Sequence, residues 1–270
     1  MWLCVLTAAL AQTPDFAEGA LPANVEDLEV EVDQPKTKLT AELGFSYASG
    51  NAVFVSLNGA LNLSHRWRRN RLMVPITLNV GQSIPDLDGS GTLDDQERAA
   101  GLQENARRVI TEPRYDRFIS ERSSLFVVLG NMHDPFLGYR ARPHQTIGYS
   151  RLFIDDDTTE LRVEIGFDFA QEFYVEGTEP DFMPIYAGRF MGVLEHAFND
   201  NVHLSDHVEL FENVLDLRDF RLLNTATLSA SLSSNLTLKL SHKLLFDNVP
   251  VETFRKTDQT TMVTLAVTLI

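Results

Sequence analysis

Cysteine and basic residues are both scarce in this sequence. Among 270 residues there is one cysteine, Cys4, which lies in the apolar opening of the chain. A framework of disulfide bonds is therefore excluded. The 23 Lys and Arg are outnumbered by 38 Asp and Glu, which gives a formal net charge of −15. Because nucleic-acid binding needs a basic face for the phosphates, we expect no nucleic-acid partner.

Long hydrophobic runs are also missing beyond the opening of the chain. No later stretch reaches the roughly 18 uninterrupted apolar residues of a membrane-spanning helix. A place in a membrane would therefore require a β-barrel, which is the other structure that satisfies every backbone polar group within lipid.

The opening MWLCVLTAALAQ resembles a secretion signal. Residues 9–11, with the sequence ALA, match the small residues of a signal-peptidase site, so we expect a signal peptide at residues 1–11. Its removal would also remove Cys4, as suits an exported protein. The opening lacks a basic start and is shorter than the roughly 15–30 residues of most signal peptides, so a retained apolar N-terminus is the alternative. We expect residues 12–37, which include NVEDLEVEVDQP, to form an acidic periplasmic tail.

From Lys36 onward the dominant period is two, which is the period of β-strands. Between residues 236 and 246 one face carries Leu236, Leu238, Leu240, Leu244 and Phe246, and the other carries Thr237, Lys239, Ser241 and Lys243. Alternation of this kind, weaker in some segments than in others, occurs at residues 39–47, 53–64, 72–80, 108–118, 125–132, 146–153, 160–169, 186–198, 202–212, 220–232, 236–246 and 263–269. The pattern predicts about twelve strands.

Short and long connections alternate between these segments. The short ones, rich in turn formers or charge, are residues 66–70, 120–122, 155–158, 199–201 and 233–235. The longer ones are residues 83–106, 133–144, 174–185, 213–219 and 247–259, and residues 49–51 are a short exception. Short turns at one end and long loops at the other are typical of bacterial outer-membrane barrels. We therefore predict an all-β fold, a closed antiparallel transmembrane β-barrel at residues 38–270.

A soluble barrel of the lipocalin type is the alternative, with the apolar faces turned inward around a ligand. The composition of the polar faces argues against it. Many small residues lie there, for example Ser56, Asn58, Ala60, Asn62 and Ser64. A face exposed to solvent more often carries Lys and Glu, so the membrane barrel is the favoured interpretation.

Four stretches carry a resemblance to a known family: ELGFSYASGNA (42–52), GYSRLFIDDDTTELRVEIGFDF (148–169), LTLKLSHKLLFDNVP (236–250) and KTDQTTMVTLAVTLI (256–270). Together they resemble the salt-induced outer-membrane protein family of Gram-negative bacteria. The resemblance implies a barrel in the bacterial outer membrane, with outer-membrane lipid and the barrel-assembly machinery as partners, and a family with no established activity. This sequence departs from the family in two places: it ends on Leu269-Ile270 instead of an aromatic residue, and it has the insertion 83–106.

The insertion at residues 83–106 contains the stretch DLDGSGTLDDQE, which fits a calcium-binding loop of the EF-hand type. Such a loop supplies oxygen ligands at positions 1, 3, 5, 7, 9 and 12, with glycine at position 6. The residues at the ligand positions are Asp86, Asp88, Ser90, Thr92 through its carbonyl, Asp94 through water, and Glu97. The residues that follow favour a short helix. We expect Ca²⁺ in this outer loop, and an acidic, turn-rich loop without metal is the alternative.

Charged residues on the polar faces are expected to point into the barrel. As possible pore-lining residues we single out Glu42, Arg162, Glu164, Asp168, Arg189, Glu195, Arg221, Lys239 and Lys243. In a barrel of intermediate width such residues can line a narrow water-filled pore, or they can pair and fill the lumen. The sequence leaves both interpretations open, together with the oligomeric state.

Two further candidates concern lipid. An outer-membrane lipid hydrolase is an alternative function, and Ser241 beside His242 is the nearest candidate for its nucleophile and base. Adjacent residues on a strand face opposite sides, so we expect no direct pairing and no enzyme activity. The basic turn 66–71, with Trp67 at the membrane interface, is suited to acidic lipid headgroups or a periplasmic partner, although it can equally be a generic charged turn.

Overall fold

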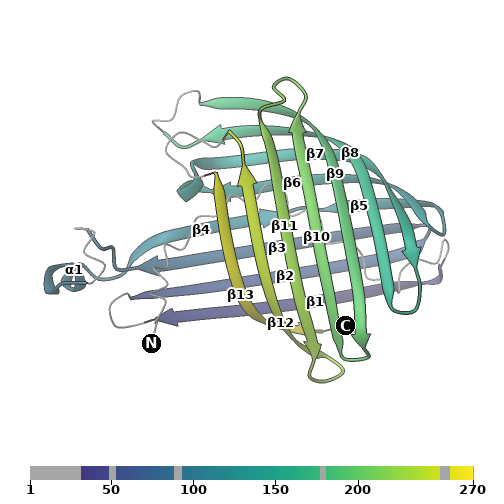
Figure 1. The fold of residues 1–270 in the computed structure, drawn as a ribbon, viewed down its shortest axis with the longest axis horizontal. Helices are drawn as coiled ribbons and strands as arrows, with labels where there is room; N and C mark the ends of the chain where they lie inside the picture. Colours follow the sequence, from purple (N-terminus) through teal and green to yellow (C-terminus); the bar gives the residue numbers. More distant parts are fainter. Residues whose placement is uncertain (1–31, 49–52, 88–92, 177–180, 250–255, 270) are drawn as a thin grey trace.

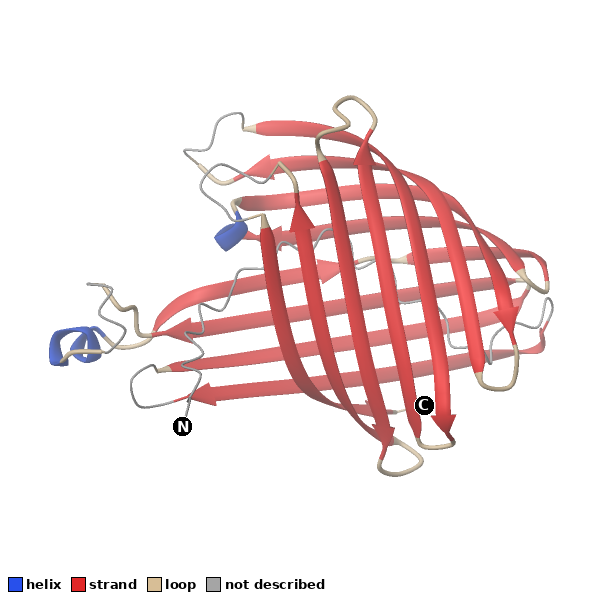
Figure 2. Cartoon of the chain, viewed as in Figure 1, coloured by secondary structure: helices blue, strands red, loops and turns tan. Residues whose placement is uncertain are grey.

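The fold is an antiparallel β-barrel, seen in a computed structural model that describes residues 32–48, 53–87, 93–176, 181–249 and 256–269 (Figure 1). Its strands are β1 (Val32–Ala48), β2 (Phe54–Arg68), β3 (Asn70–Ser83), β4 (Gln103–Thr111), β5 (Arg114–Ser120), β6 (Ser123–Asp134), β7 (Tyr139–Asp155), β8 (Thr159–Tyr174), β9 (Phe182–Asn199), β10 (Val202–Asn213), β11 (Phe220–Ser231), β12 (Leu236–Asp247) and β13 (Thr257–Thr268). The helices in the described part of the chain are α1 (Asp95–Ala100) and the short 3₁₀ helix η2 (Pro135–Leu137). Strands make up nearly all of the described chain (Figure 2).

The sheet closes on itself. Apart from β4 and β5, which each pair with β3 and β6, every strand pairs with its neighbours in the sequence, and β1 pairs with β13 through residues 40–43 and 265–268. Closure leaves no free sheet edge, which is the condition for a sheet to lie in hydrocarbon. The predicted closed barrel of twelve strands is confirmed, because β4 and β5 together occupy one position between β3 and β6.

A proline divides that fourth strand. Pro113 has no N–H to donate to the sheet, and it separates β4 from β5 where the sequence predicts one continuous strand. The neighbouring strands still hold the break, since the N–H of Leu129 donates to the Pro113 carbonyl at 2.9 Å. Glu112, beside the break, points into the barrel like Ile110 and Arg114 on either side, and it is 2% exposed.

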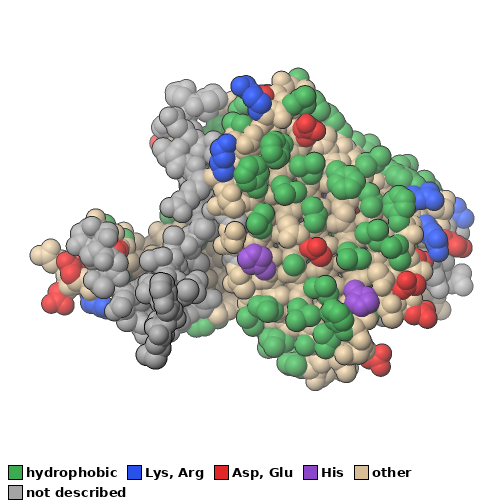
Figure 3. Space-filling model, in the orientation of Figure 1, with side chains coloured by type: hydrophobic (Ala, Val, Ile, Leu, Met, Phe, Trp, Pro, Cys, Tyr) green, Lys and Arg blue, Asp and Glu red, His purple; other side chains and the backbone are tan. Residues whose placement is uncertain are grey.

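The outer wall of the barrel is apolar. Leu43 and Phe45 on β1 are each 67% exposed, and Ile147 on β7 is 64% exposed. Apolar side chains cover the wall that faces the viewer in Figure 3, and charged side chains lie mainly toward the ends of the strands. The carboxylate of Asp206 is an exception on this wall, and it accepts a hydrogen bond of 2.6 Å from Asn224.

This arrangement decides between the two barrels that the sequence allows. Because the apolar side chains lie outside and the polar ones inside, the soluble lipocalin-like interpretation is wrong. Among the helices that the structure describes, none is both long and apolar enough to cross a bilayer. That result concerns helices alone.

Turns and loops are sorted between the two ends of the barrel. The connections after β2, β5, β7, β9 and β11 are short and lie at one end, which we call the turn end. The opposite loop end carries α1, η2 and the longer connections, and it lies on the left and at the top in Figure 1. β1 begins at Val32, so its first residues belong to the segment 12–37 that the sequence assigns to the tail. Residues 1–31, including the expected signal peptide, lie outside the described residues.

Candidate functional site

The inner wall of the barrel divides into two halves that differ in exposure. Nearly all inward side chains of β4 to β10 are buried, and we call this the packed half. Inward side chains near the middle of β1 to β3 and β11 to β13 keep partial exposure, and we call this the open half. Both halves face the same lumen. The candidate site is therefore the inner wall, where buried side chains of the packed half meet the water-accessible side chains of the open half.

At the centre of the packed half lies a group of ion pairs built on Glu164 of β8. Arg114 of β5 donates to the two carboxylate oxygens of Glu164 at 2.7 and 3.0 Å, and Arg189 of β9 donates to Oε2 at 3.0 Å. Arg114 also donates to Asp116 at 2.8 Å, and Arg189 pairs with Glu209 of β10. The side chains of Arg114, Asp116 and Glu164 are fully buried. Since β5 and β8 are not neighbours, the contact between Arg114 and Glu164 crosses the interior.

His144 of β7 extends this network toward the break in the fourth strand. Its Nδ1 lies 3.0 Å from Asp168, and its Nε2 lies 3.1 Å from Glu112. Thr146 donates a second hydrogen bond of 2.5 Å to Asp168. With a carboxylate at each ring nitrogen, the geometry favours an imidazole that is protonated on both nitrogens. The ring lies across Gly130 of β6, where a Cβ atom would come within 1.8 Å of Nε2.

A second cross-lumen group lies near the loop end and is centred on Glu172. Its Oε1 accepts from Arg142 at 3.0 Å and from Arg221 of β11 at 2.9 Å. Its Oε2 accepts from the Tyr174 hydroxyl at 2.6 Å. Arg221 also lies 3.4 Å from the carboxylate of Asp247. Strands β8 and β11 are thereby joined through the interior as well as through the sheet.

The open half has a different chemistry. Its middle is lined by small polar side chains such as Asn62, and Thr227 and Ser241 share a hydrogen bond of 2.9 Å. Its one described ion pair in this region joins Lys239 of β12 to Glu42 of β1 at 2.5 Å, and both side chains remain partly exposed. The surface in this half is therefore polar, accessible to water and nearly free of strongly held charge.

The nine residues that the sequence proposes for the lumen all lie on inward faces, but they have two different settings. Arg162, Glu164, Asp168, Arg189, Arg221 and Lys243 are buried. Arg162 donates to Glu160 at 2.5 Å, and Glu195 lies on β9 directly opposite Glu160. Glu42 and Lys239 lie in the open half. Most of the proposed residues therefore fill the lumen instead of lining a free passage.

Several residues of the network cannot be found from the alternation of the sequence. Glu112, Arg114, Asp116, Arg142 and His144 lie where the pattern is weak. The alternation is weak here because inward residues can also be apolar. On β6, for example, the inward Phe126, Val128 and Met132 are apolar like the outward residues. The only available signal is the charged stretch EPRYDR at residues 112–117, in which Glu112, Arg114 and Asp116 share one face.

Ser241 and His242 diverge as their adjacency in a strand predicts. Ser241 points inward and bonds to Thr227, whereas His242 points outward and its Nδ1 lies 2.9 Å from the Thr261 hydroxyl. These two side chains therefore do not form a nucleophile and base.

The expected calcium loop is described only in part. Asp88, Ser90 and Thr92 lie outside the described residues. Asp94 and Glu97 form a capping box at the start of α1, in which the Glu97 N–H donates to Asp94 and the Asp94 N–H donates to Glu97. The Leu87 N–H also donates to Glu97 at 2.6 Å. The short helix expected after the loop is present, and no cluster of three metal-binding side chains occurs in the part of the chain that the structure covers.

Comparison with known proteins supplies no activity for this chain. No curated protein sequence matches it. A porin named NanC shares 12% identity and a TM-score of 0.46, covering 85% of this chain and 97% of its own. An outer-membrane channel from Pseudomonas putida F1 shares 11% identity and a TM-score of 0.47, covering 89% of this chain and 98% of its own. An anion-selective porin from Comamonas acidovorans shares 7% identity and a TM-score of 0.40, covering 87% and 100%.

One family model covers most of the barrel. It matches residues 41–269, which reach from β1 past the end of β13. The chain belongs to this family, DUF481, whose description is a protein of unknown function.

Proposed function

We propose that this protein is an outer-membrane β-barrel of a Gram-negative bacterium that forms a narrow aqueous passage along its open half. The single observation that carries the proposal is the difference in exposure between the two halves of the inner wall. Side chains in the middle of the open half keep contact with solvent, while ion pairs and aromatic rings fill the packed half. We also propose that the chain is a member of the salt-induced outer-membrane protein family.

The membrane location rests on the outer wall and on the sorted ends. A closed barrel with large exposed apolar side chains cannot remain monomeric in water without a cover for that surface. Short turns at one end and longer loops at the other match the orientation in which the loop end faces outward. The insertion that carries α1 then lies outside the cell.

The passage suits small polar solutes and ions. Asn58, Asn62 and Thr77 offer hydrogen bonds from a neutral wall, and Glu42 and Lys239 contribute charges of both signs. Weak selectivity between cations and anions follows, because neither sign dominates the accessible surface.

Single-channel recording in planar bilayers tests the proposal. We expect small, discrete conductance steps from the wild-type barrel. Asn62→Trp places a large ring on the inner wall of β2 and should reduce the step size. The matched control is Leu61→Trp, since Leu61 is the adjacent outward residue and is 41% exposed. A folded wild-type protein without conductance, or equal steps from both variants, would leave a structural barrel with a closed lumen.

We also propose that the outer loop binds Ca²⁺ weakly. The acidic spacing in residues 86–97 and the short helix after it support the proposal. Bidentate binding by Glu97 would compete with the hydrogen bonds that its carboxylate now accepts from Leu87 and Asp94. Weak affinity is therefore expected, in the range of about 10⁻⁴–10⁻³ M that extracellular sites of this type show.

Calorimetry on the folded protein tests the calcium proposal. Glu97→Gln should remove the heat of calcium binding without altering the barrel. Glu104→Gln is the control, because Glu104 lies in the same insertion but outside the loop 86–97, where it pairs with Arg107. Equal heat from the wild type and the Glu97 variant would show that the loop is an acidic turn without a metal site.

A further inference from the structure

The arginine-rich turn between β2 and β3 distributes its side chains between two surfaces. Arg66 and Arg71 point inward and are 1% and 2% exposed. Arg66 lies over the Phe118 ring at 3.8 Å, and Arg71 donates to Asp116 at 3.0 Å. Arg68 and Arg69 are instead exposed, as is Arg117 on the outward face of the neighbouring strand β5. The inward arginines belong to the packed interior, so only the exposed ones can be reached from outside the barrel.

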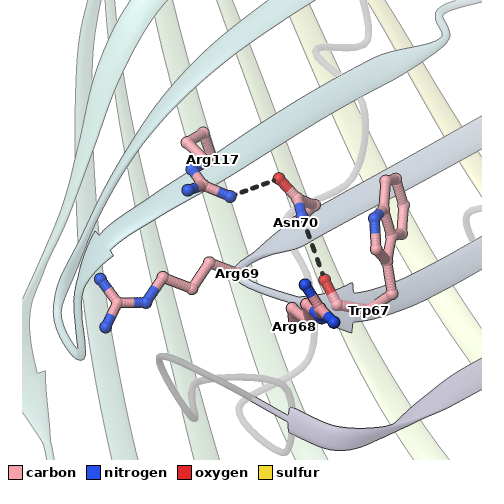
Figure 4. A pocket seen from close by; sticks show the side chains of 5 residues that line it. All are labelled: Trp67, Arg68, Arg69, Asn70 and Arg117. Carbon is pink, nitrogen blue, oxygen red and sulfur yellow. Dashed lines mark hydrogen bonds between the residues drawn. The ribbon is translucent and has the colours of Figure 1, made fainter.

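A pocket of about 440 Å³ lies at this turn. Its lining consists of Trp67, Arg68, Arg69, Asn70 and Arg117, and Figure 4 shows these five side chains. Asn70 lies between Arg117 and Trp67: its Oδ1 accepts from Arg117 at 2.9 Å, and its Nδ2 donates to the Trp67 carbonyl at 3.3 Å. The pocket therefore has a fixed amide at its centre and guanidinium groups around it.

The outward residues change in character from row to row as the strands approach the turn end. Leu63 and Val74 form one apolar row. The next row contains His65, Leu72 and Tyr115, and the last contains Trp67, Asn70 and Arg117.

The aromatic rings of the last two rows contact one another. His65 stacks on Trp67 at 5.3 Å, and Trp67 lies 6.4 Å from Tyr115. The Tyr115 hydroxyl donates to Asn70 at 2.7 Å. Apolar, aromatic and basic rows in this order match the profile of a membrane from hydrocarbon to headgroup.

Two observations argue that the arginines serve a ligand. Among the residues that the structure covers, neither Arg68 nor Arg117 forms an ion pair with a carboxylate, although the chain carries 38 Asp and Glu. In addition, Arg68 has φ of 45°, a left-handed conformation that favours glycine. A residue with a long cationic side chain thus occupies a position where backbone preference selects against it.

We infer that this pocket binds the phosphate of an anionic phospholipid headgroup in the periplasmic leaflet. The inference rests on the proposed membrane location, which puts the turn end at that leaflet. The guanidinium groups supply planar donors that match phosphate oxygens. The aromatic rows pack against the upper part of the acyl chains, so a lipid fits both surfaces, whereas free phosphate uses only the basic one.

Fluorescence of Trp67 provides a direct test. The chain has two tryptophans, and the Trp2→Phe variant leaves Trp67 as the only one. This protein is placed in phosphatidylcholine bilayers that contain a fixed fraction of phosphatidylglycerol or phosphatidylcholine with brominated acyl chains, which quench nearby tryptophan. We expect stronger quenching by the brominated phosphatidylglycerol.

Substitution of the arginines then tests whether their guanidinium groups cause the preference for anionic lipid. Each basic residue near a membrane surface contributes roughly fivefold to the preference for anionic lipid. Arg117→Gln and Arg68→Gly should therefore each reduce the preference by about that factor. Arg68→Gly also relieves the strained backbone, so a loss of preference in this variant cannot be attributed to misfolding. Arg140→Gln, an exposed arginine near the loop end of β7, should leave the preference unchanged.

The possible outcomes test the headgroup site and the membrane location independently. Equal quenching by the two brominated lipids would overturn the headgroup site and leave the membrane barrel in place. Absence of quenching by either lipid would overturn the membrane location of this end of the barrel. Inorganic phosphate added at millimolar concentration is expected to have no effect, and removal of the preference by phosphate would assign the pocket to free phosphate instead.

Discussion

The packed and open halves of the lumen show two ways in which a barrel interior can remain polar. In the packed half, charges such as Arg114 and Glu164 are removed from water and satisfied by each other. In the open half, Glu42 and Lys239 keep contact with solvent, and neutral side chains such as Thr227 and Ser241 lie on the wall beside them. The comparison teaches that inward charge does not by itself indicate a pore. Charges that are fully paired remove accessible space, and small neutral residues leave it.

Neutralising one carboxylate in each half should give the largest difference in stability between the two halves. Glu164→Gln leaves Arg114 and Arg189 buried with too little negative charge, so we expect a loss of about 3–5 kcal/mol in the free energy of unfolding. Glu42→Gln removes the partner of a Lys239 that water still reaches, and its cost should stay below about 1 kcal/mol. Urea unfolding in detergent micelles measures both. Similar costs would mean that the two halves do not differ in solvation.

A charge placed on each side of one strand compares the outer wall with the open half. Leu240→Arg puts a guanidinium on the outer wall of β12, where Leu240 is 48% exposed, and should cost about 2–4 kcal/mol. Ser241→Arg points into the open half and loses mainly the hydrogen bond to Thr227, about 1 kcal/mol. The temperature at which the folded band disappears on denaturing gels reports the order. A reversed order would require the apolar face of β12 to point inward.

Two glycines provide a test of packing density. Gly130→Ala would place a methyl group on the ring of His144, so we expect a loss of about 1–3 kcal/mol and disruption of the bonds to Asp168 and Glu112. At Gly188 no atom lies within 4 Å of the added methyl, and Gly188→Ala should be nearly neutral. Urea unfolding compares the two variants. Equal stability would show that the ring of His144 moves aside without cost.

The smallest effect is expected at a turn outside the membrane. The N–H groups of Thr158 and Thr159 donate to the Asp156 carboxylate at 3.0 and 2.7 Å, and these bonds lower the pKa of Asp156 below its ordinary value of 3.8. A depressed carboxyl pKa contributes stability above the unfolded value that is lost as the pH falls through the folded value. Unfolding temperatures at neutral pH and at about pH 3 should therefore differ slightly more in the wild type than in Asp156→Asn. An identical difference in both proteins would contradict the assignment.

The sequence predicts the outer wall better than the interior. Residues 236–241 alternate cleanly because lipid favours leucine on the outer face, and the open half of the lumen favours polar residues on the inner face. On β6 the inward Phe126, Val128 and Met132 serve the packed half, so both faces are apolar and the period of two fades. The twelve-strand barrel is therefore predictable, whereas the division of its lumen is not.

Partners across the lumen lie beyond any local pattern. Arg114 and Glu164 are 50 residues apart, and Arg221 and Glu172 are 49 apart. The sequence around each of these residues does not indicate its partner, because the curvature of the closed sheet decides which charged side chains meet across the lumen. The break at Pro113 is easier to anticipate, since proline cannot donate to a central strand. The contact of the neighbouring Glu112 with His144 depends on tertiary structure.

The contact of Arg114 with Glu164 has a consequence for how the barrel is built. A slip of one residue in the pairing of β8 would turn Glu164 toward lipid and Ile165 toward the lumen. Every slip of β8 by an odd number of residues thus places a carboxylate in hydrocarbon and removes it from the buried guanidinium groups of Arg114 and Arg189. A slip by two residues keeps Glu164 inside but moves it roughly 7 Å along the strand, away from both arginines. The interior ion pairs therefore help to specify the register of β8 in the closed barrel.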